Sequence, residues 1–370
     1  MKILFIGPLP DPITGHSLAC KIFLEELIKH HQVEVVNLSK DSFKEGMYFK
    51  RIIEVVKILQ EVWRKKKNVD VVYLTISQSF AGNIKDLFIY LICFRMLSKM
   101  YIHLHGGSLK KFMFDKSRLL FCVNKFFISR LGAVIVLGAT HVNVFTGLIS
   151  SEKIHIVPNF SEDYLFTTEA EIINKFEDTQ PLRILFLSNF IQGKGFDEII
   201  NAYMDLSEDL KKRVIIDFAG AFESDTQRMT FLSRIYRFAQ IHYHGIVEGD
   251  KKKDLLSCAH IFCLPTCLYE GQPISILEAY ASGCVVITTA QGGIPDVFRD
   301  NVNGIEVEVK SIKSLKQALE QCILSSHKLM SIAMLNFNTA LQKYRMSNHN
   351  SSLIGIIHAS SKKDSRLPRN

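Results

Sequence analysis

Two glutamates in the last third of the chain, Glu270 and Glu278, have the residue type and the setting for chemistry on hydroxyl-rich ligands. An apolar run ends at Pro265, the turn Gly271-Gln272-Pro273 follows, and residues 274–281 are apolar and rich in alanine. This pattern predicts a strand, an exposed loop that carries Glu270, and a helix that carries Glu278. A loop carboxylate can bind sugar hydroxyls, and a helical one can accept hydrogen bonds from a ribose. The alternatives are a solvated loop acid and an acid favoured in the first helical turn.

The interval between these two acids carries little information, because the pairs Glu26/Glu34 and Glu169/Glu177 share it. Only the third pair has a strand before it, a Gly-X-Pro turn within it and a glycine, Gly283, after its helix. A strand-loop-helix unit of this kind puts the loop at the edge of a parallel sheet where ligands bind. The setting, and not the spacing, makes the pair a candidate site.

Glycine-containing loops follow several other predicted strands. They are Thr14-Gly15, His105-Gly106-Gly107, Gly193-Lys194-Gly195 and Gly292-Gly293. Glycine at a strand-to-helix turn lets backbone N–H groups approach an anion, and the helix N-terminus adds a favourable field. Lys194 can place its ammonium group on a diphosphate. Each of these features taken singly is also typical of an ordinary turn or an exposed lysine.

A histidine, His105, opens one of these loops. Its imidazole can orient a hydroxyl near a reacting carbon or carry a proton. His103 lies two residues earlier and, if the strand continues, on the same face of it, so either histidine fits this pattern. A structural histidine at the end of a strand is the alternative.

Apolar runs alternate with helical patterns along nearly the whole chain. The predicted strands are residues 2–7, 33–38, 69–75, 100–105, 133–137, 153–157, 182–188, 213–219, 241–244, 261–265, 285–288 and 304–309. This alternation predicts α/β architecture with parallel sheets covered on both faces. A polar, acidic segment at 161–181 divides the pattern. We therefore predict Rossmann-like domains at 1–170 and 171–345, facing an inter-domain cleft, and a C-terminal segment at 346–370 that can return to the first domain and ends in a polar tail.

The composition is that of a globular protein of 370 residues with a formal net charge of +8. The eight cysteines are scattered and form no Cys-X-X-Cys pair, which favours free buried thiols in a reducing compartment. The longest apolar run, 87–94, is too short to cross a bilayer and predicts a core helix. No secretory signal is recognisable at Met1, so we expect a cytoplasmic protein.

The basic excess belongs to residues 1–160 and falls in clusters with aromatic residues between them. The clusters are Lys44/Lys50/Arg51, Arg64/Lys65/Lys66/Lys67 and Lys110/Lys111/Lys116/Arg118, and the aromatics include Tyr48, Phe49, Trp63, Phe112 and Phe114. Such a face suits an anionic membrane surface, which would place the protein at the inner face of the plasma membrane. A solvated helix face fits as well. Nucleic acid fits less well because no binding motif accompanies the charge.

Several motifs are absent from the sequence. There is no Gly-X-Gly-X-X-Gly, no Walker loop, no His-Glu-X-X-His and no Asp-X-Asp. These absences disfavour hydride transfer, NTP hydrolysis, zinc hydrolysis, and sugar transfer that depends on a metal held by paired aspartates. We expect neither a metal nor a cofactor.

The sequence resembles the retaining GT-B glycosyltransferases of the GT4 family, also called glycosyltransferase group 1. The resemblance is carried by residues 186–195, 265–283, 291–296 and 303–304, and more weakly by 7–15, 105–106 and 156–159. It implies a UDP- or GDP-linked sugar donor held mainly by the second domain, a saccharide acceptor on the first, and retention of anomeric configuration.

The resemblance also implies a role for individual residues. Lys194 contacts the diphosphate, Glu278 the ribose and Glu270 the donor sugar, and His105 lies beside the reacting sugar. The remaining donor-binding positions are Gly15, Asn189, Gly271, Gln272, Pro273 and Ile274. Two positions depart from the family pattern: Asn189 replaces a frequent arginine, and Thr14 replaces the first glycine of a frequent Gly-Gly pair.

No enzymic nucleophile is obvious, so we predict a front-face displacement. We expect a saccharide acceptor that is lipid-linked, in the synthesis of an O-antigen or capsule type of surface polysaccharide. The rival hypotheses are a non-catalytic binding or scaffold protein of this fold and a sugar-nucleotide epimerase of GT-B architecture. The oligomeric state, the sugar and the linkage do not follow from the sequence.

Overall fold

The structure is a computed structural model that describes residues 1–11, 13–39 and 48–364. Its contacts divide the chain into two compact units. The first comprises Met1–Pro158, Glu270–Gln272 and Ser347–Asn370, and the second Asn159–Tyr269 and Pro273–Met346. The first division falls at Pro158, earlier than the boundary at residue 170 expected from the sequence. Lys44 of the first basic cluster and the end of the predicted tail lie outside the described residues.

The first unit is built on one parallel sheet. Its strands are β1 (Lys2–Gly7), β2 (Gln32–Asn37), β3 (Val71–Thr75), β4 (Met100–Leu104), β5 (Ala133–Val136) and β6 (Ile154–Ile156). They lie in the order β2-β1-β3-β4-β5-β6, and every pair is parallel. The order reverses between β1 and β3, and a reversal of this kind opens a crevice at the carboxyl ends of the strands.

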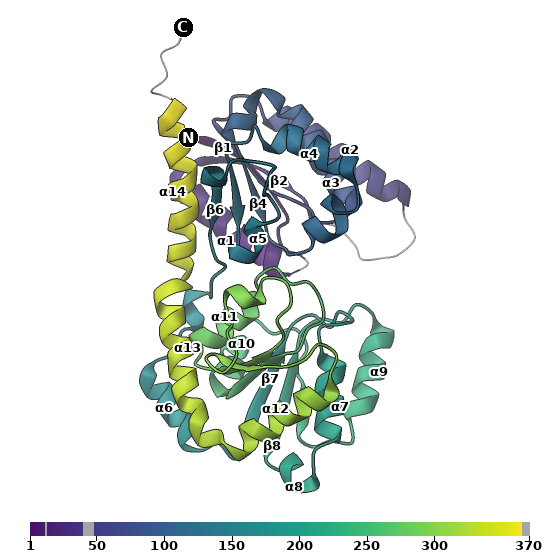
Figure 1. Ribbon diagram of the computed structural model, residues 1–370, viewed down its shortest axis with the longest axis vertical. Helices are drawn as coiled ribbons and strands as arrows, with labels where there is room; N and C mark the ends of the chain where they lie inside the picture. Colours follow the sequence, from purple (N-terminus) through teal and green to yellow (C-terminus); the bar gives the residue numbers. More distant parts are fainter. Residues whose placement is uncertain (12, 40–47, 365–370) are drawn as a thin grey trace. The chain divides into compact units, whose positions relative to one another are not determined.

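Helices cover both faces of this sheet (Figure 1). They are α1 (Gly15–His30), α2 (Tyr48–Lys65), α3 (Phe80–Ile92), α4 (Arg118–Ile128), α5 (Ala139–Val142) and α14 (Met346–Asp364), with the shorter turns η1 (Phe94–Lys99), η2 (Lys110–Phe114) and η3 (Ser151–Lys153). Alternate strand residues face opposite sides. Phe5 and Tyr73 pack with α1 and, through Leu353 and Ile357, with α14. Leu4 and its counterparts in the other strands pack with α2, α3 and α4.

The second unit has a parallel sheet of its own. Its strands are β7 (Leu182–Leu187), β8 (Val214–Ala219), β9 (Ile241–Tyr243), β10 (Ile261–Leu264), β11 (Val285–Thr288) and β12 (Gly304–Glu306). The order is β12-β11-β10-β7-β8-β9, which is the Rossmann order when it is read from β9. The reversal lies between β7 and β10. The loops that follow these two neighbouring strands carry Lys194 and Glu270.

The helices of the second unit flank this sheet (Figure 1). They are α6 (Glu169–Glu177), α7 (Phe196–Met204), α8 (Glu208–Lys211), α9 (Asp225–Ile235), α10 (Gly249–Cys258), α11 (Ile274–Ala281), α12 (Ile312–Leu324) and α13 (Leu329–Lys343), with η4 (Asp163–Leu165), η5 (Ile294–Asp296) and η6 (Ser326–Lys328). The α/β prediction with two parallel-sheet domains is confirmed. The polar segment at 161–181 contains helix α6. A capping box formed by Thr168 and Glu171 starts this helix, and the buried side chain of Ile172 packs it on the core.

One expectation about α3 is wrong in part. The apolar run at 87–94 includes the buried residues Ile89 and Tyr90, as a core helix requires, but Phe88 is 49% exposed and Leu91 is 58% exposed. The helix therefore presents an apolar face to its surroundings. Among the described residues, no helix has both the length and the apolar character needed to cross a membrane.

Aromatic packing in the second unit gives a test of its core. The ring of Phe218 is fully buried and lies 5.7 Å from Phe186 and 5.2 Å from Phe231, centroid to centroid. Phe218→Ala should lower the free energy of unfolding of this unit by about 3 to 5 kcal/mol, because it removes a large buried side chain and leaves a cavity. Tyr236→Ala, at a residue that is 83% exposed, should change it by no more than about 0.5 kcal/mol. Urea unfolding followed by circular dichroism measures both, and equal effects would contradict this core assignment.

Candidate functional site

The loop between β7 and α7 has a backbone that depends on glycine. Gly193 and Gly195 both have φ near +96°, a conformation that side-chain-bearing residues rarely adopt. A Cβ atom on Gly195 would lie 2.6 Å from the carbonyl oxygen of Pro265, so glycine also permits close approach to the end of β10. Half-buried Lys194 is held between these two glycines, directly before the N-terminus of α7.

Hydrogen bonds join this loop to the loop that follows β10. The backbone N–H of Cys267 donates to the carbonyl of Gly193 at 2.7 Å, and the Thr266 hydroxyl donates to the same carbonyl at 3.4 Å. Thr289, after β11, donates from its hydroxyl to the carbonyl of Thr266 at 2.6 Å. The structure thus brings together the ends of β7, β10 and β11, as the sequence predicted for loops at one edge of the sheet.

Asn189, the departure from the family pattern, connects two further strands. Its Oδ1 accepts a hydrogen bond from the backbone N–H of Ala221 at 3.4 Å, which ties the loop after β7 to the loop after β8. Glu270 is half-buried and directly precedes the turn Gly271-Gln272-Pro273. Gln272 is buried and Pro273 is the N-cap of α11, so Ile274 is the first helical residue.

Glu278 lies on α11, but not at its start. The first turn of α11 contains no acidic residue, so the interpretation of Glu278 as an acid favoured by a helix N-terminus is wrong. The whole residue is only 3% exposed. The Lys252 Nζ lies 2.6 Å from the Glu278 Oε1 and 3.4 Å from the Glu162 Oε2, so one ammonium group links two carboxylates.

Burial and charge act in opposite directions on this ion pair. Burial tends to lower the pKa of Lys252, but Glu278 and Glu162 outweigh it and raise the pKa. Burial raises the pKa of Glu278, and Lys252 opposes that rise. The short charge-assisted hydrogen bond favours the ionised pair and fixes the direction of the Glu278 carboxylate.

Lys252 is the residue that the sequence did not indicate. It is the middle residue of Lys251-Lys252-Lys253 in α10, and such a run is typical of a solvated helix face. Lys251 and Lys253 are exposed, while Lys252 is half-buried. The sequence offers one indirect indication of this role: α10 directly precedes β10, so one face of the helix lies near the edge of the sheet where the loops of the candidate site are found.

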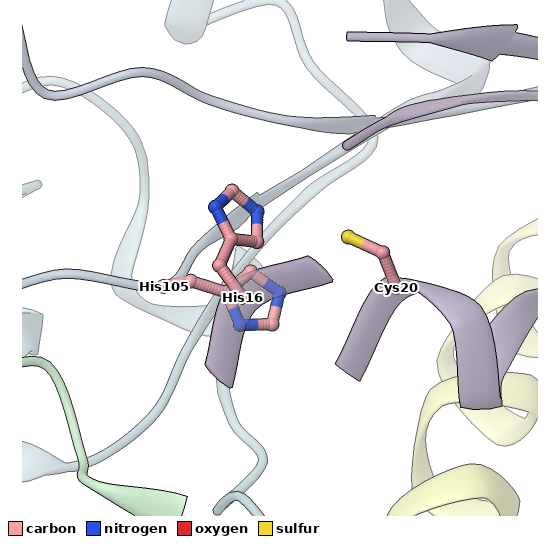
Figure 2. Close-up of side chains that lie close together, drawn as sticks. All are labelled: His16, Cys20 and His105. Carbon is pink, nitrogen blue, oxygen red and sulfur yellow. The ribbon is translucent and has the colours of Figure 1, made fainter. Parts of the chain in front are cut away.

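In the first unit, His105 directly follows β4 and lies against the start of α1. Thr14 caps α1 through a capping box with Ser17, and Gly15 is the first helical residue. The rings of His16 and His105 stack with a centroid distance of 4.5 Å and an interplanar angle of 23° (Figure 2). The structure therefore brings together the loops after β1 and β4 that the sequence singled out.

His103 in β4 and His105 directly after it have different surroundings. His103 is fully buried, and its Nδ1 lies 2.6 Å from the Tyr73 hydroxyl. Both ring nitrogens of His105 are shielded from solvent and have no hydrogen-bond partner among the described residues. A buried polar atom without a hydrogen-bond partner lowers the stability of the folded protein unless a ligand or water pairs with it. His103 has one such nitrogen, Nε2, whereas His105 has two, which favours His105 as the residue that contacts a ligand.

His16, Cys20 and His105 place three potential metal ligands within 4.8 Å of one another (Figure 2). Their geometry does not favour a metal ion. The nitrogen lone pairs lie in the ring planes, so two stacked imidazoles cannot both direct a lone pair at one ion without a rotation. Burial raises the pKa of the Cys20 thiol to about 12, so without a metal ion the thiol is protonated.

Buried histidines should make stability depend on pH. Burial, reinforced by Lys85, lowers the pKa of His16 to about 4, and burial lowers that of His349 to about 4 despite the carbonyl of Pro158. Burial also lowers the pKa of His103 and of His105. The folded protein keeps these rings neutral, whereas the unfolded chain binds protons below its ordinary pKa of about 6.5. Their contribution to stability is therefore complete above pH 6.5 and is lost as the pH falls toward 4.

The melting temperature should accordingly fall between pH 7 and pH 5. His349→Gln should flatten this dependence, because one buried ring is removed, whereas His327→Gln, at an exposed position, should leave it unchanged. Calorimetry at several pH values measures the slope. The same slope in wild type and in His349→Gln would contradict this origin of the acid sensitivity.

Solved structures with a similar fold are known. Anabaena HepE in complex with UDP and glucose matches with a TM-score of 0.71 and 17% identity over 97% of this chain and 100% of that one. WaaG, a glycosyltransferase involved in lipopolysaccharide biosynthesis, matches with a TM-score of 0.70 and 15% identity over 96% and 99%. These likenesses confirm the GT-B class of fold.

Sequence comparison finds a known family that part of the chain resembles. Residues 168–333 match the family of glycosyl transferases group 1. Glycosyltransferase MJ1069 of Methanocaldococcus jannaschii is 24% identical over 62% of this chain and 60% of its own length. The GPI3 subunit of phosphatidylinositol N-acetylglucosaminyltransferase from Saccharomyces cerevisiae is 26% identical over 47% and 38%. The match thus spans about 60% or less of these relatives. The predicted resemblance to group 1 glycosyltransferases is confirmed over residues 168–333.

Proposed function

We propose that this protein is a glycosyltransferase that moves a sugar from a UDP- or GDP-linked donor to a saccharide acceptor. The observation that carries the proposal is the junction of the β7 and β10 loops at the strand reversal of the second unit, where the loop of Lys194 is hydrogen-bonded to Cys267. Helix α11 of the same unit carries Glu278, whose carboxylate Lys252 orients. Nucleotides bind at such reversals in parallel sheets. HepE, which shares the fold, is known in complex with UDP and glucose.

Each candidate residue has a role in this proposal. Lys194 neutralises the diphosphate, with Asn189 and the N–H groups of its loop beside it. Glu278 accepts hydrogen bonds from the ribose, and Lys252 positions it. Glu270 and the backbone of Gly271-Gln272-Pro273-Ile274 bind the donor sugar.

The first unit contributes His105 and Gly15. Burial keeps His105 neutral, so it acts as a hydrogen-bonding group toward a sugar hydroxyl and not as a cation. Gly15 begins α1 and leaves its backbone accessible to the donor. We assign the acceptor to this unit.

The reaction that we propose is a front-face displacement that retains anomeric configuration. The bond from the anomeric carbon to the diphosphate oxygen breaks, the acceptor oxygen bonds to the same carbon, and the acceptor proton passes to the departing phosphate. Lys194 and the N-terminus of α7 stabilise the developing negative charge. No metal takes part.

The acceptor that we propose is a lipid-linked saccharide of a bacterial surface polysaccharide. Two relatives are named for the biosynthesis of such polymers. They are the putative colanic acid biosynthesis glycosyltransferase WcaL of Escherichia coli, 27% identical over 38% of this chain, and the amylovoran biosynthesis glycosyltransferase AmsK of Erwinia amylovora, 28% identical over 34%. The basic first half would hold the protein at an anionic membrane surface on the cytoplasmic side.

Incubation with a panel of nucleotide sugars, with and without lipid-linked acceptors, tests the activity. A transferase releases nucleoside diphosphate and extends the acceptor only when both substrates are present. An epimerase would convert the donor alone, and a scaffold protein would consume nothing. Mass spectrometry of donor and acceptor distinguishes these outcomes, and either of the last two would overturn the proposal.

Removal of the ammonium group from Lys252 should weaken donor binding. Lys252→Met should raise the donor KM about tenfold or more with a smaller change in kcat, because a hydrogen bond to a charged group is worth about 1.5 to 3 kcal/mol. Lys252→Arg should restore part of the affinity. The matched control is Lys253→Met, at the exposed neighbouring position. An unchanged KM in Lys252→Met, or an equal rise in both Met variants, would contradict the positioning role.

Removal of metals should leave transfer intact. After dialysis against EDTA the rate of transfer should match that of the untreated enzyme, since Lys194 and helix α7 supply the positive field at the diphosphate. Added Zn²⁺ should not raise the rate, because the stacked rings of His16 and His105 do not direct two lone pairs at one ion. Loss of activity in EDTA with recovery in Mg²⁺ or Mn²⁺ would rule out the metal-free mechanism.

A further inference from the structure

Large apolar side chains are exposed on three neighbouring helices and one turn of the first unit. They include Trp63 on α2, Phe88 and Leu91 on α3, Phe94 on η1, and Leu119 and Phe126 on α4, and each of these six is at least 45% exposed. Helix α2 packs on α3, and α3 packs on α4 and η1. The rings of Phe94 and Phe126 stack at 6.2 Å with an angle of 14°, which makes the surface continuous between η1 and α4. We call these six residues the apolar face.

A pocket of about 440 Å³ opens beside this apolar face. The turn directly after α2 contributes Lys66 and Lys67 to its lining, and Arg95 comes from η1. The apolar part of the lining includes Leu91 and Phe94, so the pocket and the apolar face share residues. The pocket therefore presents positive charge above an apolar wall.

The cations of this pocket are not neutralised within the described part of the chain. No carboxylate of the described residues lies within ion-pair distance of Lys66, Lys67 or Arg95. Lys66 donates to the carbonyl of Ile92, which holds its ammonium group at the pocket, and the Lys67 ammonium lies 5.5 Å from the centre of the Trp63 ring. Two of the three side chains, Lys67 and Arg95, are exposed.

We propose that this face docks on the surface of a membrane that contains anionic phospholipid. The phosphate of a lipid headgroup lies in the pocket against Lys66, Lys67 and Arg95, and the apolar face enters the boundary between headgroups and acyl chains. The arrangement of charged and apolar side chains favours a membrane as the partner. Cations lie beside exposed tryptophan, phenylalanine and leucine side chains, and this is the composition of a segment that anchors a protein in the membrane interface. An acidic protein surface would complement the cations but would not require so large an apolar area.

This inference rests on the proposed function and names the surface by which the transferase would bind a membrane. It can be tested separately from sugar transfer, because lipid binding requires neither donor nor acceptor. Trp63 is the single tryptophan of the chain and is 59% exposed, so its fluorescence reports directly on this face. Vesicles of phosphatidylcholine with 30% phosphatidylglycerol should shift the emission of the full chain to shorter wavelength, and lipids brominated on the acyl chain should quench it. Pure phosphatidylcholine vesicles and inorganic phosphate should do neither.

Variants separate the contributions of charge and apolar surface. The triple change Lys66→Gln, Lys67→Gln, Arg95→Gln should lower affinity for the anionic vesicles at least about tenfold and remove most of its salt dependence. The double change Leu91→Ser, Phe94→Ser should lower affinity similarly while keeping the salt dependence. The control Lys212→Gln, Lys251→Gln, Lys253→Gln removes three exposed cations of the second unit and should leave binding unchanged.

Three results would overturn the proposal. The first is equal binding of wild type to neutral and anionic vesicles. The second is a loss of affinity in the control variant equal to that of the triple variant. The third is a blue shift that depends on protein concentration in the absence of vesicles, which would assign the apolar face to contact with a second copy of the chain. Circular dichroism of each variant confirms that it is folded. A protein that binds vesicles but transfers no sugar would contradict the proposed function alone.

Discussion

The close approach of two loops in the second unit sets the geometry of the candidate site. Gly195 lies against the carbonyl of Pro265 so tightly that a side chain would have no space, and the Gly193 carbonyl accepts a hydrogen bond from Cys267. Any larger residue at 195 would separate the two loops. Because β7 and β10 are neighbours at the point where the strand order reverses, this contact holds the Lys194 loop beside the loop that leads to α11. A backbone contact, and not a pair of side chains, thus organises the site.

Electrostatics add a second constraint at the same edge of the sheet. Glu278 is almost fully buried, which would favour its neutral form, yet Lys252 lies within a short hydrogen bond of it. The pair keeps a carboxylate ionised and oriented where water is scarce, the condition under which hydrogen bonds to ligand hydroxyls are strongest. In the first unit the balance differs: His105 is shielded and without a charged partner, so it stays neutral.

Much of this architecture could be predicted from the sequence, because buried parallel strands appear as short apolar runs and their loops as glycine-rich breaks. The predicted ends of β11 agree with the structure, as does the start of β4, and the end of β4 differs by one residue. Contacts between side chains distant in the sequence could not be predicted. Nothing in the run Lys251-Lys252-Lys253 marks its middle residue as the partner of Glu278, and nothing in the apolar run at 87–94 shows that Phe88 and Leu91 face outward. Both depend on helix rotation relative to the sheet, which tertiary packing decides.

Calorimetric titration of UDP and of GDP into the protein tests the central claim, that the β7–β10 junction is a nucleotide-diphosphate site. One of the two nucleotides should bind with a 1:1 stoichiometry, and Lys194→Met should weaken that binding about tenfold or more, because one cation at the diphosphate is lost. Lys212→Met, at an exposed lysine of the same unit, should bind like wild type. Absence of binding of either nucleotide, or equal affinity in wild type and Lys194→Met, would contradict the account.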